Sequence, residues 1–315
     1  MRFVFRADAS MSVGSGHVMR SSAIAEEAIA RGIPSFFVGK ISDLTWVSER
    51  IRGLGFMQVL ENFSEFIPDK NEDILIIDSY EIPTDDVFVQ LRNWSKIVSI
   101  FDELTPDYPC DLRIHPGLTK AWPELFSGRT LSGPKFVPLR KSIKHSKAHT
   151  PEGTLEVLVV GGGSDTYGFV PAVVNVLTKL TQDFHATIFT NSLLGMDLDK
   201  RFSVSKVGLN LDLVANAADL VFTTASTTSL EFLARETAVA IGCAVDNQEL
   251  YYKELNIGGY AAPIGEFLND EWHLNTELIQ ELVSSETLRA KLRENSVDLI
   301  DFDGAKRIVD EILKL

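Results

Sequence analysis

The sequence has few cysteines and no long apolar run. Its two cysteines, Cys110 and Cys243, form no CxxC-type motif, so we expect reduced, structural thiols. No stretch approaches the roughly 18 uninterrupted apolar residues of a membrane-spanning helix. The short apolar run at the N-terminus is broken by Arg6 and Asp8, unlike the core of a signal peptide. These absences favour a cytoplasmic protein without stable membrane association.

Positive charge is also scarce. The chain has 30 Lys and Arg against 44 Asp and Glu, a formal net charge of -14. Binding to a phosphate backbone needs clustered Lys and Arg, so we expect no nucleic-acid partner. An anionic small ligand stays compatible with this charge, because a helix N-terminus binds phosphate through its backbone N–H groups.

The length and the apolar pattern both indicate two α/β domains. At 315 residues the chain exceeds the size at which one hydrophobic core usually stops growing. Strand-like segments alternate with segments of helical spacing, and strands apolar on both faces indicate parallel sheets covered by helices. The predicted strands are 2–5, 33–38, 73–78, 97–101, 155–160, 185–191, 220–224 and 239–243. A region rich in proline, 106–138, is predicted to be irregular.

A polar stretch, 141–153, is predicted to link the domains. We therefore predict two Rossmann-like domains, 1–145 and 152–315, that face a central cleft. The last helix, 303–315, with Asp303 as its N-cap, is a candidate to pack back on the N-terminal domain.

The first candidate ligand-binding turn is Gly14-Ser15-Gly16-His17, which follows the first predicted strand. Ligands of open α/β sheets bind beyond the carboxyl ends of the strands. The positive end of the helix dipole disfavours a charged imidazole, and a neutral His17 is what a general base requires. The alternative is that His17 caps the helix or packs between domains. The turn lacks the third glycine of a dinucleotide fingerprint, which counts against a nicotinamide cofactor.

Two further turns lie in the second half. Gly161-Gly162-Gly163-Ser164-Asp165 follows a buried strand and could cradle phosphate, or be only a tight connection. No lysine follows it, so the Walker pattern is absent. The segment 223–229 has six hydroxyl residues in seven, more than helix capping by one of them requires. We predict that it holds a diphosphate, with Glu231 accepting from ribose hydroxyls or completing a capping box.

Polar residues also follow two other strands. Asp78-Ser79-Tyr80 ends a buried strand on the same sheet edge as His17, and Asp246-Asn247-Gln248 follows the strand that ends at Cys243. Either segment alone is typical of an ordinary loop. Their shared position at strand ends favours a ligand site.

Together these motifs resemble a known enzyme family. The segments are RADAS (6–10), GSGHVMR (14–20), DSY (78–80), GGGSD (161–165), ASTTSLE (225–231), DNQ (246–248) and DGAKR (303–307). They resemble the UDP-2,4-diacetamido-2,4,6-trideoxy-β-L-altropyranose hydrolases of pseudaminic acid biosynthesis, relatives of the GT-B glycosyltransferases that form lipid II. The resemblance spans nearly the whole chain. It implies metal-independent hydrolysis of a UDP-sugar to UDP and a free deoxy-amino sugar, with inversion and without a cofactor.

The resemblance also implies roles for individual residues. His17 would activate the water and Tyr80 would orient the sugar or water, with Asp78 beside them as the third catalytic candidate. The substrate-binding candidates are Arg6, Asp8, Gly14, Gly16, Gly162, Gly163, Ser164, Ser226, Thr227, Thr228, Ser229, Glu231, Asn247 and Gln248.

Four positions depart from the family pattern: Ser79, Glu81, Ala225 and Leu230 stand where His, Gly, Gly and Trp are usual. We expect these changes to affect the sugar more than the reaction. Two other functions fit the same motifs. One is a GT-B-type glycosyltransferase that uses a UDP-sugar donor, and the other is a nucleotide-sugar sensor without catalysis.

Overall fold

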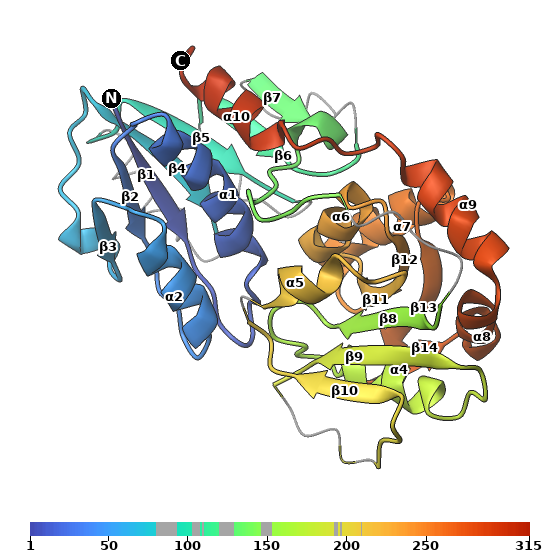
Figure 1. Ribbon diagram of the computed structural model, residues 1–315. Helices are drawn as coiled ribbons and strands as arrows, with labels where there is room; N and C mark the ends of the chain where they lie inside the picture. The colour runs from blue at the N-terminus through green and yellow to red at the C-terminus, as the bar shows by residue number, and fades with distance from the viewer. Residues whose placement is uncertain are drawn as a thin grey trace. The chain divides into compact units, whose positions relative to one another are not determined.

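The computed structural model describes residues 1–79, 93–102, 108, 110–119, 129–145, 153–191, 195, 197–208 and 210–315. These residues form two compact units, which Figure 1 colours along the chain. Unit 1 comprises 1–141 and 301–315, and unit 2 comprises 142–300. Tyr80, Glu81 and residues 146–152 of the predicted linker lie outside the described residues.

Unit 1 contains a parallel sheet with the strand order β3-β2-β1-β4-β5-β6-β7. The strands are β1 (Arg2–Ala7), β2 (Ser35–Val38), β3 (Gln58–Leu60), β4 (Asp73–Asp78), β5 (Lys96–Ile100), β6 (Leu112–His115) and β7 (Arg129–Ser132). The helices are α1 (Gly16–Ala30), α2 (Thr45–Gly53) and α10 (Gly304–Ile312), with short 3-10 turns η1 (Phe63–Glu65) and η3 (Pro134–Phe136). The prediction that 106–138 is irregular was therefore wrong, because this region supplies β6, β7 and η3.

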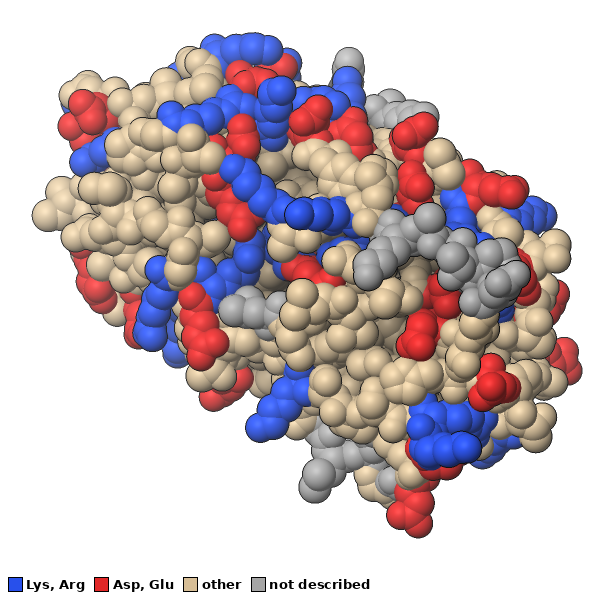
Figure 2. All heavy atoms as spheres, viewed as in Figure 1, with Lys and Arg blue, Asp and Glu red and all other residues tan. Residues whose placement is uncertain are grey.

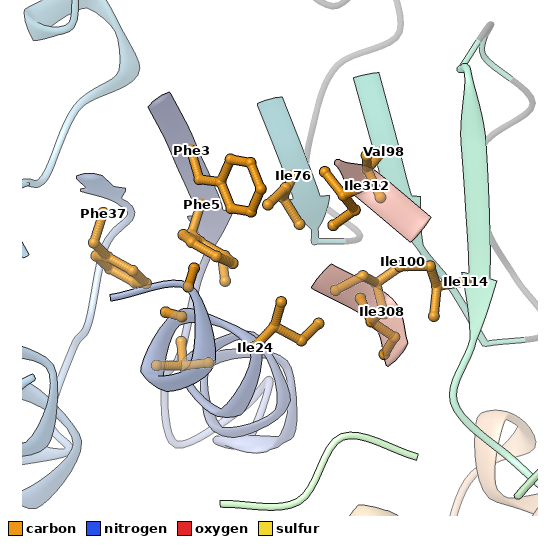
Figure 3. Close-up of a cluster of buried hydrophobic side chains, with 14 of the residues drawn as sticks. Phe3, Phe5, Ile24, Phe37, Ile76, Val98, Ile100, Ile114, Ile308 and Ile312 are labelled. Carbon is orange, nitrogen blue, oxygen red and sulfur yellow. The ribbon is translucent and has the colours of Figure 1, made fainter. Parts of the chain in front are cut away.

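The last helix belongs to the core of unit 1. Ile308 and Ile312 of α10 are fully buried in the same cluster as Phe3 and Phe5 of β1, as Figure 3 shows. The start of α10 approaches the backbone so closely that a Cβ on Gly304 would lie 2.0 Å from the Val137 carbonyl oxygen. Packing of apolar side chains, rather than a cap, holds this helix.

The two ends of α10 differ in their polar contacts. Asp303 occupies the N-cap position of α10, but its side chain makes no capping hydrogen bond, contrary to the expected role. At the other end, an ion pair of 2.5 Å joins Arg31 Nη1 to Asp310 Oδ1. The contact between α1 and α10 thus combines a buried apolar face with a charged rim.

Unit 2 repeats the same plan with the order β10-β9-β8-β11-β12-β13-β14. Only the last pair, β13 with β14, is antiparallel. The strands are β8 (Leu155–Val160), β9 (Phe184–Phe189), β10 (Phe202–Ser205), β11 (Leu220–Thr224), β12 (Ala238–Cys243), β13 (Ala262–Leu268) and β14 (Glu271–Leu274). The helices are α4 (Phe169–Leu177), α5 (Leu211–Ala215), α6 (Thr227–Ala234), α7 (Glu249–Ile257), α8 (Thr276–Ser284) and α9 (Glu286–Ser296), with a 3-10 turn η4 (Asp246–Gln248). The predicted α/β class with two Rossmann-like units is confirmed.

Each sheet has one point where the strand order reverses. In unit 1 the chain runs outward from β1 through β2 to β3, then returns to β4 on the other side of β1. In unit 2 the same reversal lies between β8 and β11. Loops diverge at such a switch point, and ligands of open α/β sheets bind in the crevice between them. The fold therefore marks two places to search for a site.

The surface has no strongly basic character on the face in view. Figure 2 shows Asp and Glu interspersed with Lys and Arg over this face. Among the described residues, no helix is both long and apolar enough to cross a membrane.

Candidate functional site

A buried histidine–aspartate pair lies at the switch point of unit 1. His17 is the second residue of α1, and Asp78 is the last residue of β4, the strand that pairs with β1. His17 Nδ1 lies 2.6 Å from Asp78 Oδ1, and the histidine is 6% exposed. An ionised carboxylate only accepts hydrogen bonds, so Nδ1 carries the proton and donates it. In the neutral imidazole Nε2 is then the acceptor, which is the tautomer that a general base needs.

Arg20 binds the same carboxylate from one helical turn further along α1. Its Nε donates to Asp78 Oδ2 and its Nη2 to Oδ1, both over 2.7 Å. Its Nη1 donates to Asp102 Oδ1, also over 2.7 Å. Nη2 lies 3.2 Å from His17 Nδ1, but two N–H groups cannot bond each other, so this contact is only a close approach. Hydrogen-bond donors and acceptors therefore alternate in the order His17, Asp78, Arg20 and Asp102.

The electrostatics of this cluster keep Asp78 ionised. Burial alone would raise the pKa of Asp78, but the charges of Arg20 and His17 and their hydrogen bonds outweigh it and hold that pKa below its usual range. His115, at the end of β6, is also completely buried. Burial lowers the pKa of His115 to about 4, so this second histidine is neutral at pH 7.

Arg20 and Asp102 were not predicted from the sequence as site residues. Arg20 could have been found, because residues three apart on a helix share a face and it lies three residues after His17. Asp102 follows the end of β5 at the same sheet edge as Asp78, which is a weaker signal. Tyr80, the remaining catalytic candidate, lies outside the described residues.

Arg6 and Asp8 form a second polar group, beside the pair. Arg6 Nη1 lies 2.5 Å from Asp8 Oδ2. The Asp8 carboxylate also accepts from the Lys40 backbone N–H over 2.7 Å and from the Ser79 hydroxyl over 3.1 Å. Asp8 thus ties the end of β1 to the segments that follow β2 and β4. Ser79, one of the departures from the family pattern, is part of this network.

A pocket of about 350 Å³ opens at the ends of β1, β2 and β3. It is lined by Arg6, Asp8, Ala9, Ser10, Val13, Lys40, Ser42, Glu61, Asn62 and Phe63. The loop that lines it continues through Gly14, whose φ of 84° favours glycine, to Gly16 at the start of α1. One loop therefore forms part of the pocket and positions His17.

The glycine turn of unit 2 follows β8 at the second switch point. Gly162 has a φ of 77°, which favours glycine, while Gly161 is covered by the Asp165 side chain. The Asp165 carboxylate accepts from the Val170 N–H in the first turn of α4, over 3.2 Å at its nearer oxygen. Burial raises the pKa of Asp165 to about 7. The Asp165 side chain covers Gly161 and bonds to the first turn of α4. The part of the turn left for a ligand is therefore Gly162, Gly163 and Ser164.

The hydroxyl-rich turn follows β11 on the other side of that switch point. Ser226, Thr227 and Thr228 are half-buried around the start of α6. Ser229 is completely buried, and its hydroxyl donates to the Ser226 carbonyl over 2.6 Å. The backbone N–H groups at the N-terminus of α6 and the hydroxyls of Ser226, Thr227 and Thr228 are thus placed to meet a phosphate.

The remaining candidates of unit 2 have mixed positions. Glu231 is half-buried in α6, and Asn247 is half-buried in η4. The Gln248 side-chain oxygen accepts from the Ala244 N–H over 2.9 Å, which closes the turn after β12. Ala225 and Leu230 are completely buried in the core, so neither presents its side chain at the surface of the turn.

The fold brings these turns together. β8, β11 and β12 are neighbours in the sheet, so the glycine turn, the hydroxyl-rich turn and η4 follow adjacent strand ends. The Ala225 N–H donates to the Gly242 carbonyl over 2.8 Å, which links the hydroxyl-rich turn to the end of β12, the strand that precedes η4. Within the described residues, no group of three or more His, Cys, Asp and Glu is arranged to hold a metal ion.

Comparison with known proteins finds similarity in structure alone. No protein-family model and no curated protein sequence matches the chain. UGT89C1 from Arabidopsis thaliana, solved with UDP, is 10% identical with a TM-score of 0.69, covering 99% of each chain. MurG from Acinetobacter baumannii is 13% identical with a TM-score of 0.65, covering 100% of both chains. The spinosyn rhamnosyltransferase SpnG, solved with thymidine diphosphate, is 12% identical with a TM-score of 0.65, again covering 100% of both.

At this level of identity the likeness concerns the fold. The chain has the GT-B-like fold of these glycosyltransferases, with two Rossmann-like units. A fold hosts many reactions, so the function has to be argued from the site.

Proposed function

We propose that the protein is a nucleotide-sugar enzyme that breaks the bond between the anomeric carbon and the diphosphate. The observation that carries this proposal is the buried His17–Asp78 pair at the switch point of unit 1. His17 Nε2 takes the proton from an oxygen nucleophile, whose oxygen forms the new bond to the anomeric carbon. The diphosphate leaves with the electron pair of the broken bond, and the imidazolium later releases its proton to solvent. Such a single displacement inverts the anomeric centre.

The turns of unit 2 support a nucleoside diphosphate as the leaving group. Helix N-termini and glycine turns stabilise developing negative charge through backbone N–H groups. The start of α6 and the turn at Gly162 and Gly163 supply such groups on both sides of one switch point. The solved structures with UDP and thymidine diphosphate favour a pyrimidine nucleotide, and we take UDP as the first choice.

The nucleophile is either an acceptor hydroxyl or water. The likeness to a rhamnosyltransferase favours transfer to a hydroxyl, and the pocket beside the His17 loop offers about 350 Å³ for an acceptor. The motif resemblance instead favours hydrolysis in pseudaminic acid biosynthesis. We place glycosyl transfer first and hydrolysis second.

One experiment tests the reaction and separates the two nucleophiles. The protein is incubated with UDP-, TDP-, GDP- and CMP-sugars, with and without a mixture of sugar acceptors, and products are followed by NMR. Release of UDP only when an acceptor is present indicates a transferase. Release of UDP and free sugar at full rate in water alone indicates the hydrolase. If no nucleotide sugar is cleaved, the proposal is wrong.

Two histidine variants test the role of the base. His17→Ala should lower the rate on the best substrate by ~10²–10⁴-fold, the usual contribution of a general base. The control is His185→Ala, which breaks a partly exposed pair of the same kind, His185 Nδ1 with Glu156 Oε2 at 2.9 Å. This control should keep the wild-type rate. A wild-type rate in His17→Ala would refute the assignment.

A further inference from the structure

The charge cluster around His17 extends further than a catalytic pair needs. Arg20 and Asp102 continue it away from the histidine, and each of the three links in the cluster is 2.6–2.7 Å long. The four residues come from α1, β4 and the segment after β5, and none is more than 6% exposed. Burying ionised groups costs desolvation energy that ion pairing often only just offsets. A cluster of this kind is therefore a poor device for stability alone.

Arg20 has a geometric effect on the pair. It contacts both oxygens of Asp78, and the Ser21 hydroxyl donates to Oδ2 over 3.2 Å. A carboxylate held by a forked guanidinium cannot rotate freely. Asp78 is thereby fixed in the orientation that accepts the Nδ1 proton of His17.

Arg20 also has an electrostatic cost, which Asp102 offsets. A cation beside Asp78 cancels part of the negative charge that would stabilise an imidazolium. With Asp102 included, the cluster has charge -1 while His17 is neutral and 0 once it holds a second proton. Without Asp102 the same step would go from 0 to +1, which a buried site disfavours.

We infer that Arg20 and Asp102 are positioning residues for the His17 base: Arg20 orients Asp78, and Asp102 restores the negative charge that lets His17 take up a proton. The catalytic part of this inference rests on the proposed function. The charge balance itself can be measured without any turnover.

Other charged and titratable groups lie around the cluster, and they are the same in the wild type and in each variant. Among the described residues they include Arg6 and Asp8 at the end of β1, His115 and Arg113 on β6, and Tyr108. Burial keeps His115 neutral by lowering its pKa, Arg113 donates to the Tyr108 carbonyl over 3.1 Å, and burial raises the pKa of Tyr108 above its ordinary value. A change in the titration of His17 in a variant therefore reports the residue that was altered.

The test is an NMR titration of the His17 imidazole, assigned by comparison with His17→Gln. Asp102→Asn removes one negative charge at nearly constant shape, so the titration midpoint should move to lower pH by on the order of 1 unit. Asp102→Glu should return it towards wild type. The control is Asp310→Asn, which removes the carboxylate paired with Arg31 at the other end of α1 and should leave the midpoint unchanged. An unchanged or higher midpoint in Asp102→Asn would overturn the inference.

A second variant separates the orienting effect of Arg20 from its charge. It also tests the inference if Asp102→Asn does not fold. Arg20→Lys keeps the charge but loses the forked contact, so kcat should fall at least ~10-fold with KM nearly constant. In the same variant the His17 midpoint should stay close to that of the wild type. A wild-type kcat would show that Arg20 does not position the base. If no nucleotide sugar is cleaved by the wild type, the proposed function fails, while the midpoint measurements still decide the charge balance.

Discussion

At the scale of single residues, the chemistry proposed for unit 1 depends on Asp78. The Asp78→Asn variant can no longer fix the Nδ1–H tautomer of His17 as a carboxylate does, because its amide can also present an N–H group. We expect kcat/KM to fall by ~10²–10⁴-fold, in the range seen when the partner of a catalytic histidine is lost. The matched control is Glu156→Gln at the surface pair with His185, which should change kcat/KM less than twofold. Equal rates in the two variants would contradict the role of Asp78.

Asp165 makes a separate prediction about stability and pH. Its pKa is raised by burial to about 7, whereas in the unfolded chain it has an ordinary value near 3.8. Between these values the folded state binds more protons, so the free energy of unfolding falls as pH rises from about 4 to 7, by up to ~4 kcal/mol. Asp165→Asn removes this contribution but keeps an acceptor for the Val170 N–H. Urea denaturation at pH 5 and pH 8 should show a smaller pH difference in the variant, and an identical difference would contradict the account.

At the scale of elements, the docking of α10 depends on the absence of a side chain at Gly304. A Cβ there would lie 2.0 Å from the Val137 carbonyl oxygen, which is backbone and cannot turn aside. Gly304→Ala should therefore displace α10 and lower the free energy of unfolding by ~1–3 kcal/mol. Gly53→Ala, at the end of α2 in open space, should be neutral or stabilising by up to about 1 kcal/mol. Urea unfolding of both variants decides this, and equal midpoints would refute the close packing.

Elements with continuous apolar runs could be predicted from the sequence, and others could not. β4 and β8 were predicted because each contains a run of at least four consecutive buried or nearly buried residues that is mainly apolar. β6 was missed because its buried residues include Arg113 and His115, which read as polar loop. β3 was missed because it is a three-residue edge strand with hardly any burial. Apolar periodicity therefore does not reveal a strand that buries charged residues, or a short strand at the edge of a sheet.

The candidate site likewise has features that could be predicted from the sequence and features that could not. Positions next to strand ends, such as His17 and the hydroxyl-rich turn, could be predicted because the fold places strand ends at one edge. Contacts between different segments could not be predicted from the sequence. The structure shows that Asp102 accepts from Arg20 and that Asp165 accepts from the Val170 N–H at the start of α4.

At the scale of the whole molecule, the two units have different tasks within one repeated plan. In the proposed function, unit 1 supplies the base and unit 2 supplies the nucleotide-binding turns. UDP alone should therefore slow amide hydrogen exchange at 162–164 and 224–228, and leave α8 unchanged. The measurement is exchange followed by mass spectrometry with and without saturating UDP. Protection confined to unit 1 would contradict this division.

The central claim is a single displacement at the anomeric carbon by a nucleophile that His17 activates. The most direct test is the configuration of the first product, read by ¹H NMR from the coupling of its anomeric proton before mutarotation. The account predicts a product inverted relative to the nucleotide-sugar donor. A product that retains the donor configuration would contradict it, because a single displacement at the anomeric carbon inverts the configuration of that carbon.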